Sequence, residues 1–152
     1  MTARTDIPSA IVLAILTVAD RYVLQLRDNF PTIASPGHWG LFGGGIEEHE
    51  TPAEAIRREI GEELCLDVRN WRQLWTVRYY VPFWDGVVRH FIFTADVTGD
   101  WERHALREGQ ATGVFGIDKL PQPMQPVVSA LIERHYTSVL ARNLPSPCRV
   151  CQ

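Results

Sequence analysis

The sequence has no long hydrophobic run, few cysteines and no excess of positive charge. None of its apolar segments reaches the length of a membrane-spanning helix, so we expect no membrane partner. Three cysteines are an odd number and fall below the density of a secreted disulfide scaffold, which favours a reducing compartment and therefore the cytoplasm. The formal net charge of -3 argues against a stable nucleic-acid complex, which would need a basic face, but allows a small anionic ligand.

Length and composition indicate one compact domain. At 152 residues, with 45% hydrophobic and 10% aromatic content, the chain can bury one core and has no room for a second domain. We place this domain at residues 1–142. The segment 143–152 contains two prolines and lacks periodicity, which predicts a mobile tail. A homodimer is compatible with the sequence.

The pattern of apolar and turn residues predicts a chain of strands with two helices. Ala19-Asp20-Arg21 separates the first two strands as a hairpin, and Asp85-Gly86 is a favourable turn for a second hairpin. The apolar run 7–18 is short and broken by Pro8, so we interpret it as a buried strand and not as a signal peptide. The predicted strands are Ile11 to Val18, Tyr22 to Leu26, Trp39 to Phe42, Trp71 to Phe83, Val87 to Val97 and Val114 to Ile117, and the predicted helices are 51–64 and 127–140.

The first predicted helix has a strong start signal. Thr51 is a favourable N-cap, Pro52 suits the first helical position, and Glu54 completes a capping box. Three-four spacing predicts that one side of the helix faces the core and that its carboxylates lie on a different, more open side. The residues predicted to face the core are Ala53, Ile56, Ile60 and Leu64.

Seven carboxylates lie between Gly43 and Leu66, around a glycine-rich turn and this helix. Glu59, Glu62 and Glu63 stand three and four residues apart, so they project from neighbouring positions of the helix. Like charges at this spacing repel one another, and a hard divalent cation that prefers oxygen ligands would turn the repulsion into binding.

The residues from Gly44 to Leu66 resemble the Nudix hydrolase box, which reads Gly, five residues, Glu, seven residues, Arg-Glu-apolar-x-Glu-Glu-x-Gly-apolar. Here Gly44 and Glu50 are followed by Arg58-Glu59-Ile60-Gly61-Glu62-Glu63-Leu64-Cys65-Leu66. Cys65 stands where the family has glycine, and His49 replaces a glycine usual before the first box glutamate. Since glycine often closes a helix in the left-handed conformation, Cys65 could cost roughly 1 kcal/mol there.

The resemblance implies both a fold and a chemistry. Periodicity alone supports only a mixed α and β domain, whereas the family implies an α/β/α sandwich with a mixed central sheet. The family cleaves the diphosphate linkage of nucleoside diphosphate derivatives, with Mg²⁺ or Mn²⁺ and with water as the nucleophile. The metal ligands that it implies are Glu59, Glu62, Glu63 and the carbonyl of Gly43. It also implies that Arg58 orients the glutamates and engages Glu50.

One further carboxylate, Glu108, lies in the segment Arg107-Glu108-Gly109-Gln110. This segment resembles the loop that supplies a distal metal ligand or general base in MutT-like members. Deprotonating the attacking water needs a carboxylate beside it. We favour Glu108 for this task, with Glu102 and Glu63 as the alternatives; Glu108 could also be only a solvated loop charge.

The substrate is open at this point. The segments Leu24 to Asp28 and Pro36 to Gly44 resemble MutT-like enzymes that act on nucleoside triphosphates, including oxidised ones. Pro82 and the Tyr79-Tyr80 pair instead resemble features of ADP-ribose and dinucleoside polyphosphate hydrolases. Our candidates for substrate binding are Gly44, Gly45, Arg27 and Tyr80. An alternative of another class is a Nudix module that senses a nucleotide without cleaving it, although such modules would be expected to lose box glutamates.

Overall fold

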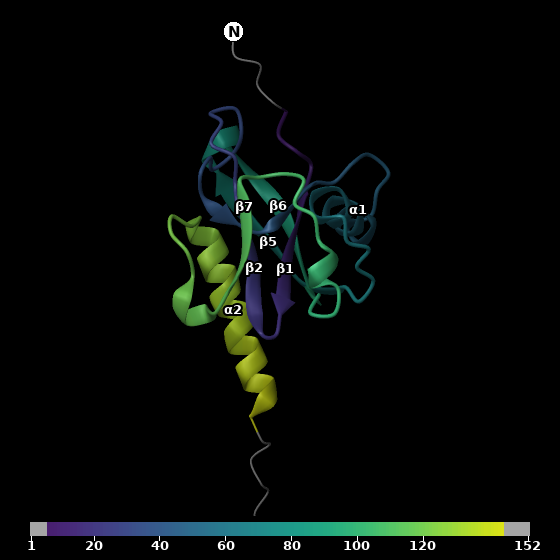
Figure 1. The fold of residues 1–152 in the computed structure, drawn as a ribbon. Coiled ribbons are helices and arrows are strands. Elements are labelled where there is room, and N and C mark those ends of the chain that lie inside the picture. Colours follow the sequence, from purple (N-terminus) through teal and green to yellow (C-terminus); the bar gives the residue numbers. More distant parts are fainter. Residues whose placement is uncertain (1–5, 145–152) are drawn as a thin grey trace, which may run out of the picture.

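The computed structural model describes residues 6–144, which form a seven-stranded sheet between two helices (Figure 1). The strand order is β3-β2-β1-β6-β5, with β4 paired to β1 and β7 paired to β2. The strands are β1 (Ile11–Val18), β2 (Arg21–Leu26), β3 (Trp39–Gly40), β4 (Phe42–Gly45), β5 (Arg72–Val81), β6 (Gly86–Asp96) and β7 (Ala111–Phe115). The helices are α1 (Pro52–Leu64) and α2 (Pro126–Asn143), and the short 3₁₀ turns are η1 (Pro82–Trp84), η2 (Trp101–Arg103) and η3 (Ile117–Lys119).

The sheet is mixed, as the predicted fold requires. β1 runs parallel to β6, and every other pairing is antiparallel. One core cluster packs between the sheet and α1 and contains Val12, Phe42 and Ile60, while a second contains Ile15, Leu24 and Ile132 on the side of α2. The two helices therefore cover opposite faces (Figure 1), and the α/β/α sandwich is confirmed.

Helix α1 begins and ends as predicted. Thr51 accepts a hydrogen bond from the Glu54 amide and Glu54 bonds back to the Thr51 amide, so the capping box is complete. One core position was wrong: Ala53 is exposed, and Ala55 is buried in its place. The open position of Glu63 was also wrong, since its side chain is buried at 3% exposure. Glu63 follows Ile60 by three residues and Ile56 by seven, which is core spacing.

Two further differences concern element boundaries. The glycines at 43–45 form strand β4 against β1 instead of a turn, because backbone pairing with β1 satisfies their amides and carbonyls. Helix α2 extends the predicted 127–140 at both ends, from Pro126 to Asn143. Of the predicted tail, 143–152, only the first two residues are among those that the structure describes. Two of the three cysteines, Cys148 and Cys151, lie outside the described residues. No helix between residues 6 and 144 is long and apolar enough to cross a membrane.

Candidate active site

Strand β4 brings the backbone close to α1, and its glycines permit the approach. Gly43 has a φ of 145°, and a Cβ there would lie 2.0 Å from the Val12 carbonyl oxygen, so only glycine fits. A Cβ on Gly44 would lie 2.6 Å from a carboxylate oxygen of Glu59. Glu59 therefore rests directly on the bare backbone of Gly44, and a side chain at either position would displace part of the site.

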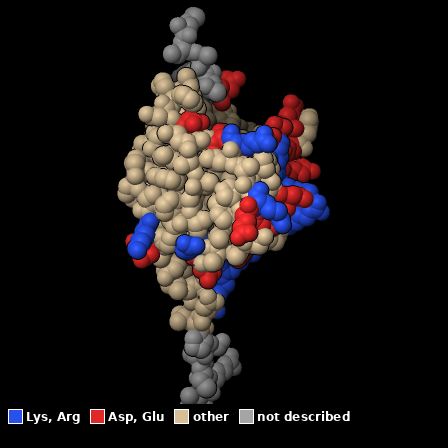
Figure 2. Space-filling model, viewed as in Figure 1, with Lys and Arg blue, Asp and Glu red and all other residues tan. Residues whose placement is uncertain are grey.

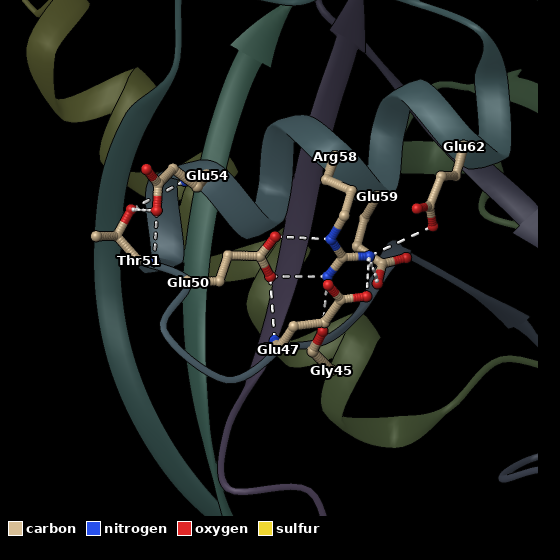
Figure 3. A network of polar contacts seen from close by, with 8 residues as sticks. All are labelled: Gly45, Glu47, Glu50, Thr51, Glu54, Arg58, Glu59 and Glu62. Carbon is tan, nitrogen blue, oxygen red and sulfur yellow. Dashed lines mark hydrogen bonds and ion pairs between the residues drawn. The ribbon is translucent and has the colours of Figure 1, made fainter.

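Arg58 is the centre of a network of ion pairs on this side of α1 (Figure 3). Its guanidinium donates two hydrogen bonds to Glu50, at 2.7 and 2.8 Å, in a bidentate arrangement. It also donates to Glu59 at 2.8 Å, to Glu62 at 3.3 Å and to the Gly45 carbonyl at 3.0 Å. The carboxylates of Glu50 and Glu59 are each only 13% exposed, so Arg58 compensates charges that water reaches poorly.

Glu63 is the most deeply buried carboxyl of this group. Its Oε2 accepts a hydrogen bond from the Gly43 amide at 3.0 Å, which ties α1 to β4. Burial, followed by the nearby charges of Glu108 and Glu59, raises the pKa of Glu63 to about 9. Burial likewise raises the pKa of Glu59, against the opposing effect of Arg58. The surroundings of Glu59 and Glu63 therefore disfavour their charged forms, because both side chains are buried and other carboxylates lie nearby.

The loop that carries Glu108 lies beside these two carboxylates. Glu108 is itself exposed, yet its charge contributes to the raised pKa of both Glu59 and Glu63. Glu102, the alternative base, contributes to neither and sits in the 3₁₀ turn η2. Among the loop carboxylates considered from the sequence, the structure brings Glu108 to the cluster.

The candidate substrate residues differ in their distance from the cluster. Arg27 is half-buried at the end of β2, near enough to Glu63 to lower its pKa, and its Nε donates to the Ala34 carbonyl at 2.8 Å. Tyr80 lies on β5, three strand positions from β4 and thus about 14 Å across the sheet. The Tyr80 hydroxyl donates to Asp85 in the β5–β6 hairpin, so Tyr80 belongs to a separate part of the surface.

Charged side chains gather on the side of the molecule where α1 lies, and the opposite side in this view is largely uncharged (Figure 2). The donors there fit an oxygen-preferring divalent cation: Glu59 and Glu63 are crowded carboxylates in a poorly hydrated setting, and a cation would relieve both their repulsion and their burial cost. Among residues 6–144, no three His, Cys, Asp or Glu side chains already stand close enough to form a ready-made metal site.

Both positions at which this chain replaces a family glycine adopt a left-handed backbone. Cys65 caps α1 with a φ of 56° and ψ of 29°, and His49 has a φ of 64°. Cys65 therefore closes α1 in the left-handed conformation that glycine often adopts at this position. The Arg107 Nε also lies 3.2 Å from the Cys65 sulfur.

Gln25, a fully buried glutamine in the apolar run Leu24-Gln25-Leu26, was not predicted from the sequence. Its Nε2 donates to the Leu41 carbonyl at 3.1 Å, just before β4. A polar side chain at an inward-facing position of a buried strand was the available signal, because such a group needs a hydrogen-bond partner.

Comparison with known proteins adds the family. A family model, the NUDIX domain, matches residues 7–134. A nucleoside triphosphatase NudI from Enterobacter sp. is 66% identical over 29 residues, which are 19% of this chain and 21% of that protein. The 8-oxo-dGTP diphosphatase of Proteus vulgaris is 33% identical over 66 residues, 43% of this chain and 54% of that protein. The chain thus spans about half or less of the length of these curated relatives.

Solved structures share the fold at low sequence identity. The MutT protein from Methanosarcina mazei Go1 superposes with a TM-score of 0.73 at 19% identity, covering 89% of this chain and 97% of that one. The NUDIX domain of Shewanella oneidensis NrtR, complexed with ADP ribose, gives a TM-score of 0.70 at 19% identity, covering 91% and 93%. Since the family model spans residues 7–134, most of the sequence, the chain belongs to the NUDIX domain family.

Proposed function

We propose that this chain is a metal-dependent pyrophosphohydrolase that cleaves a nucleoside triphosphate, ordinary or oxidised, and releases a nucleoside monophosphate. The observation that carries the proposal is the set of crowded carboxylates, Glu59 and Glu63 with Glu108 nearby, packed against the bare backbone of Gly43 and Gly44. Carboxylates placed this close repel one another when no cation is bound, whereas a divalent cation would bind their oxygens together with those of a polyphosphate. The NudI and 8-oxo-dGTP diphosphatase relatives support this substrate class.

Glu59, Glu62 and Glu63, with the Gly43 carbonyl and Glu108, would hold Mg²⁺ or Mn²⁺. When bound, the cation polarises phosphorus, shields phosphate charge and lowers the pKa of a coordinated water. Arg58 orients Glu59 and Glu62 through the hydrogen bonds that it donates. Arg58 is itself held in place by the two hydrogen bonds that it donates to Glu50, so its guanidinium is a fixed donor for Glu59 and Glu62.

Glu108 would accept the proton of the attacking water. It is exposed, so it can reach a bound substrate, and it lies beside the two most buried carboxylates of α1. Arg27 would contact substrate phosphates, since its positive charge, at the end of β2, lies close enough to Glu63 to lower the pKa of that carboxyl. Gly44 and Gly45 would let a phosphate approach the backbone of β4 closely.

ADP-ribose is a second candidate substrate. Pro82 begins the 3₁₀ turn η1 at the end of β5, the position that resembles ADP-ribose hydrolases, and the NrtR domain of similar fold is complexed with ADP ribose. A nucleotide sensor without activity is less well supported, because Arg58, Glu59, Glu62 and Glu63 are all retained.

The test compares turnover of wild type, Glu59→Gln and Glu63→Gln on ordinary and oxidised dNTPs, ADP-ribose and diadenosine polyphosphates. We expect a fall of at least 100-fold in kcat for both variants on the preferred substrate. Glu48→Gln is the matched control, since Glu48 is 89% exposed and pairs with the equally exposed His49, and it should retain activity. Unchanged turnover in Glu59→Gln and Glu63→Gln would refute the site assignment, and preference for ADP-ribose would select the second substrate.

A further inference from the structure

The loop 104–110, which carries Glu108, is fixed to α1 on one side. The Ala105 amide donates to the Leu64 carbonyl at 3.0 Å, and the Arg107 amide donates to the Glu63 carbonyl at 2.9 Å. The last four carbonyls of a helix lack intrahelical partners, so the loop satisfies two of them. The first half of the loop therefore moves with the helix that carries the box carboxylates.

The other half of the loop is fixed to the end of β2. The Gln110 amide donates to the Leu26 carbonyl at 2.8 Å, and the Gln110 side-chain Nε2 donates to the Arg27 carbonyl, also at 2.8 Å. Strand β7 then continues from Ala111, which pairs with Leu26. Gln110 thus binds two successive carbonyls, that of Leu26 at the end of β2 and that of Arg27, which follows β2.

Gly109 allows the chain to turn between these attachments. Its φ is +89°, and a Cβ there would lie 2.9 Å from the Leu26 carbonyl oxygen and 3.1 Å from the Gln25 Oε1. The Leu26 oxygen is backbone and already accepts from Gln110, so it cannot move away freely. Gln25 is fully buried and bonded to the Leu41 carbonyl, so it too is held in place. Only glycine fits without displacing the loop.

We propose that Gly109 and Gln110 are positioning residues that hold Glu108 beside Glu59 and Glu63. The inference rests on the proposed role of Glu108 as the base that takes the proton of the attacking water. An exposed loop carboxylate has many accessible positions, and a base must lie within hydrogen-bond reach of the proton it accepts. Attachment on both sides, to α1 and to β2, restricts Glu108 to the positions beside the box carboxylates.

The first test compares Gly109→Ala with Gly99→Ala. A Cβ on Gly99 would meet no atom within 4 Å, so Gly99→Ala is a matched control for the glycine substitution itself. We expect Gly109→Ala to lower kcat by about 10- to 100-fold with KM within about twofold, since misplacement of a catalytic group by 1 Å can cost 10²-fold. Gln110→Ala keeps the main-chain bond and should lose about 3- to 10-fold. Equal kcat in Gly109→Ala and Gly99→Ala would overturn the proposal.

The second test asks whether Gly109 acts through Glu108. If it does, Gly109→Ala should cost less than twofold in a Glu108→Gln background, because the misplaced group is already absent. If the two losses multiply, Gly109 has a different role and the proposal fails while the hydrolase assignment stands. A Glu108→Gln variant with wild-type kcat would instead refute the assignment of the base, and with it the positioning role.

A third measurement does not depend on catalysis. In amide hydrogen exchange, the Arg107 and Gln110 amides should be protected in the wild type and should exchange at least 10-fold faster in Gly109→Ala. The amides of β1 should not change, since that strand is buried and is paired with β6 on one edge and with β2 and β4 on the other. Unchanged protection of Arg107 and Gln110 would show that Gly109 does not hold the loop, whatever the substrate of the enzyme is.

Discussion

Replacement of Arg58 should destabilise the fold as well as remove activity. Arg58→Ala deletes a guanidinium that is 22% exposed and leaves the carboxylates of Glu50 and Glu59, each 13% exposed, without their cation. Removing one partner of a buried ion pair costs about 3–5 kcal/mol. Because these groups keep partial contact with water, we expect about 2–3 kcal/mol. For a domain of this length, such a loss lowers Tm by about 4–12 °C.

Two further variants separate charge from geometry. Arg58→Lys keeps the positive charge but loses the two-pronged contact with Glu50, so we expect an intermediate loss of about 1 kcal/mol. Arg57→Ala is the matched control, since Arg57 is 51% exposed and pairs with Asp67, which is 55% exposed. Exposed pairs contribute little, and this variant should stay within about 0.5 kcal/mol of wild type.

The assay is urea denaturation at pH 7 with a chelator present, followed by circular dichroism. The free energy of unfolding should fall in the order wild type, Arg58→Lys, Arg58→Ala. If Arg58→Ala were no less stable than Arg57→Ala, the network in Figure 3 would not hold α1 against the segment before it, and the reasoning from burial would be wrong.

The remaining predictions concern proton binding and backbone conformation. The pKa of Glu63 is raised to about 9 in the folded state, from about 4.3 in the unfolded state, so the folded protein binds this proton more tightly than the unfolded chain does. The metal-free protein should therefore lose stability as the pH rises from about 4 to 9. Urea denaturation should show a smaller loss in Glu63→Gln, and equal slopes would contradict the shift. Cys65→Gly should raise Tm by about 2–4 °C, because glycine adopts the left-handed conformation of this helix cap without strain, whereas Cys65→Ala should not raise it. Equal Tm values for the two variants in calorimetry would show that backbone strain at position 65 is not the cause. Gly43→Ala should unfold or strongly destabilise the protein, because the added carbon would lie 2.0 Å from its nearest neighbour. Gly45→Ala should cost under about 1 kcal/mol, because its added carbon would lie 3.7 Å from the nearest atom. Similar melting temperatures for the two variants would refute the packing argument.

Local signals made α1 predictable from the sequence. Thr51 and Glu54 form a capping box through contacts within a single turn, so no knowledge of the rest of the fold is needed. The expected strain of a residue other than glycine at position 65 likewise came from a single position in a known motif, and Cys65 does adopt the left-handed conformation. The hairpin β5–β6 was likewise recognised from Asp85 and Gly86.

What could not be predicted depends on contacts between distant segments. The parallel pairing of β1 with β6 joins Ile11 to His90, and nothing local to either strand specifies it. Burial of Glu63 was missed because a carboxylate was assumed to avoid the core; its cost is offset in part by the Gly43 amide, which comes from another strand. The hydrogen bond from Gln110 to the Arg27 carbonyl spans more than eighty residues of sequence and was equally hidden.

The most direct test of the central claim is product analysis with purified full-length protein. Ordinary and oxidised dNTPs would be incubated with Mg²⁺, with Mn²⁺ and with excess chelator, and the products identified by ion-exchange chromatography. We predict a nucleoside monophosphate and pyrophosphate, formed with either metal and abolished by the chelator. Release of a nucleoside diphosphate with inorganic phosphate, or equal turnover with and without chelator, would contradict a metal-dependent pyrophosphohydrolase.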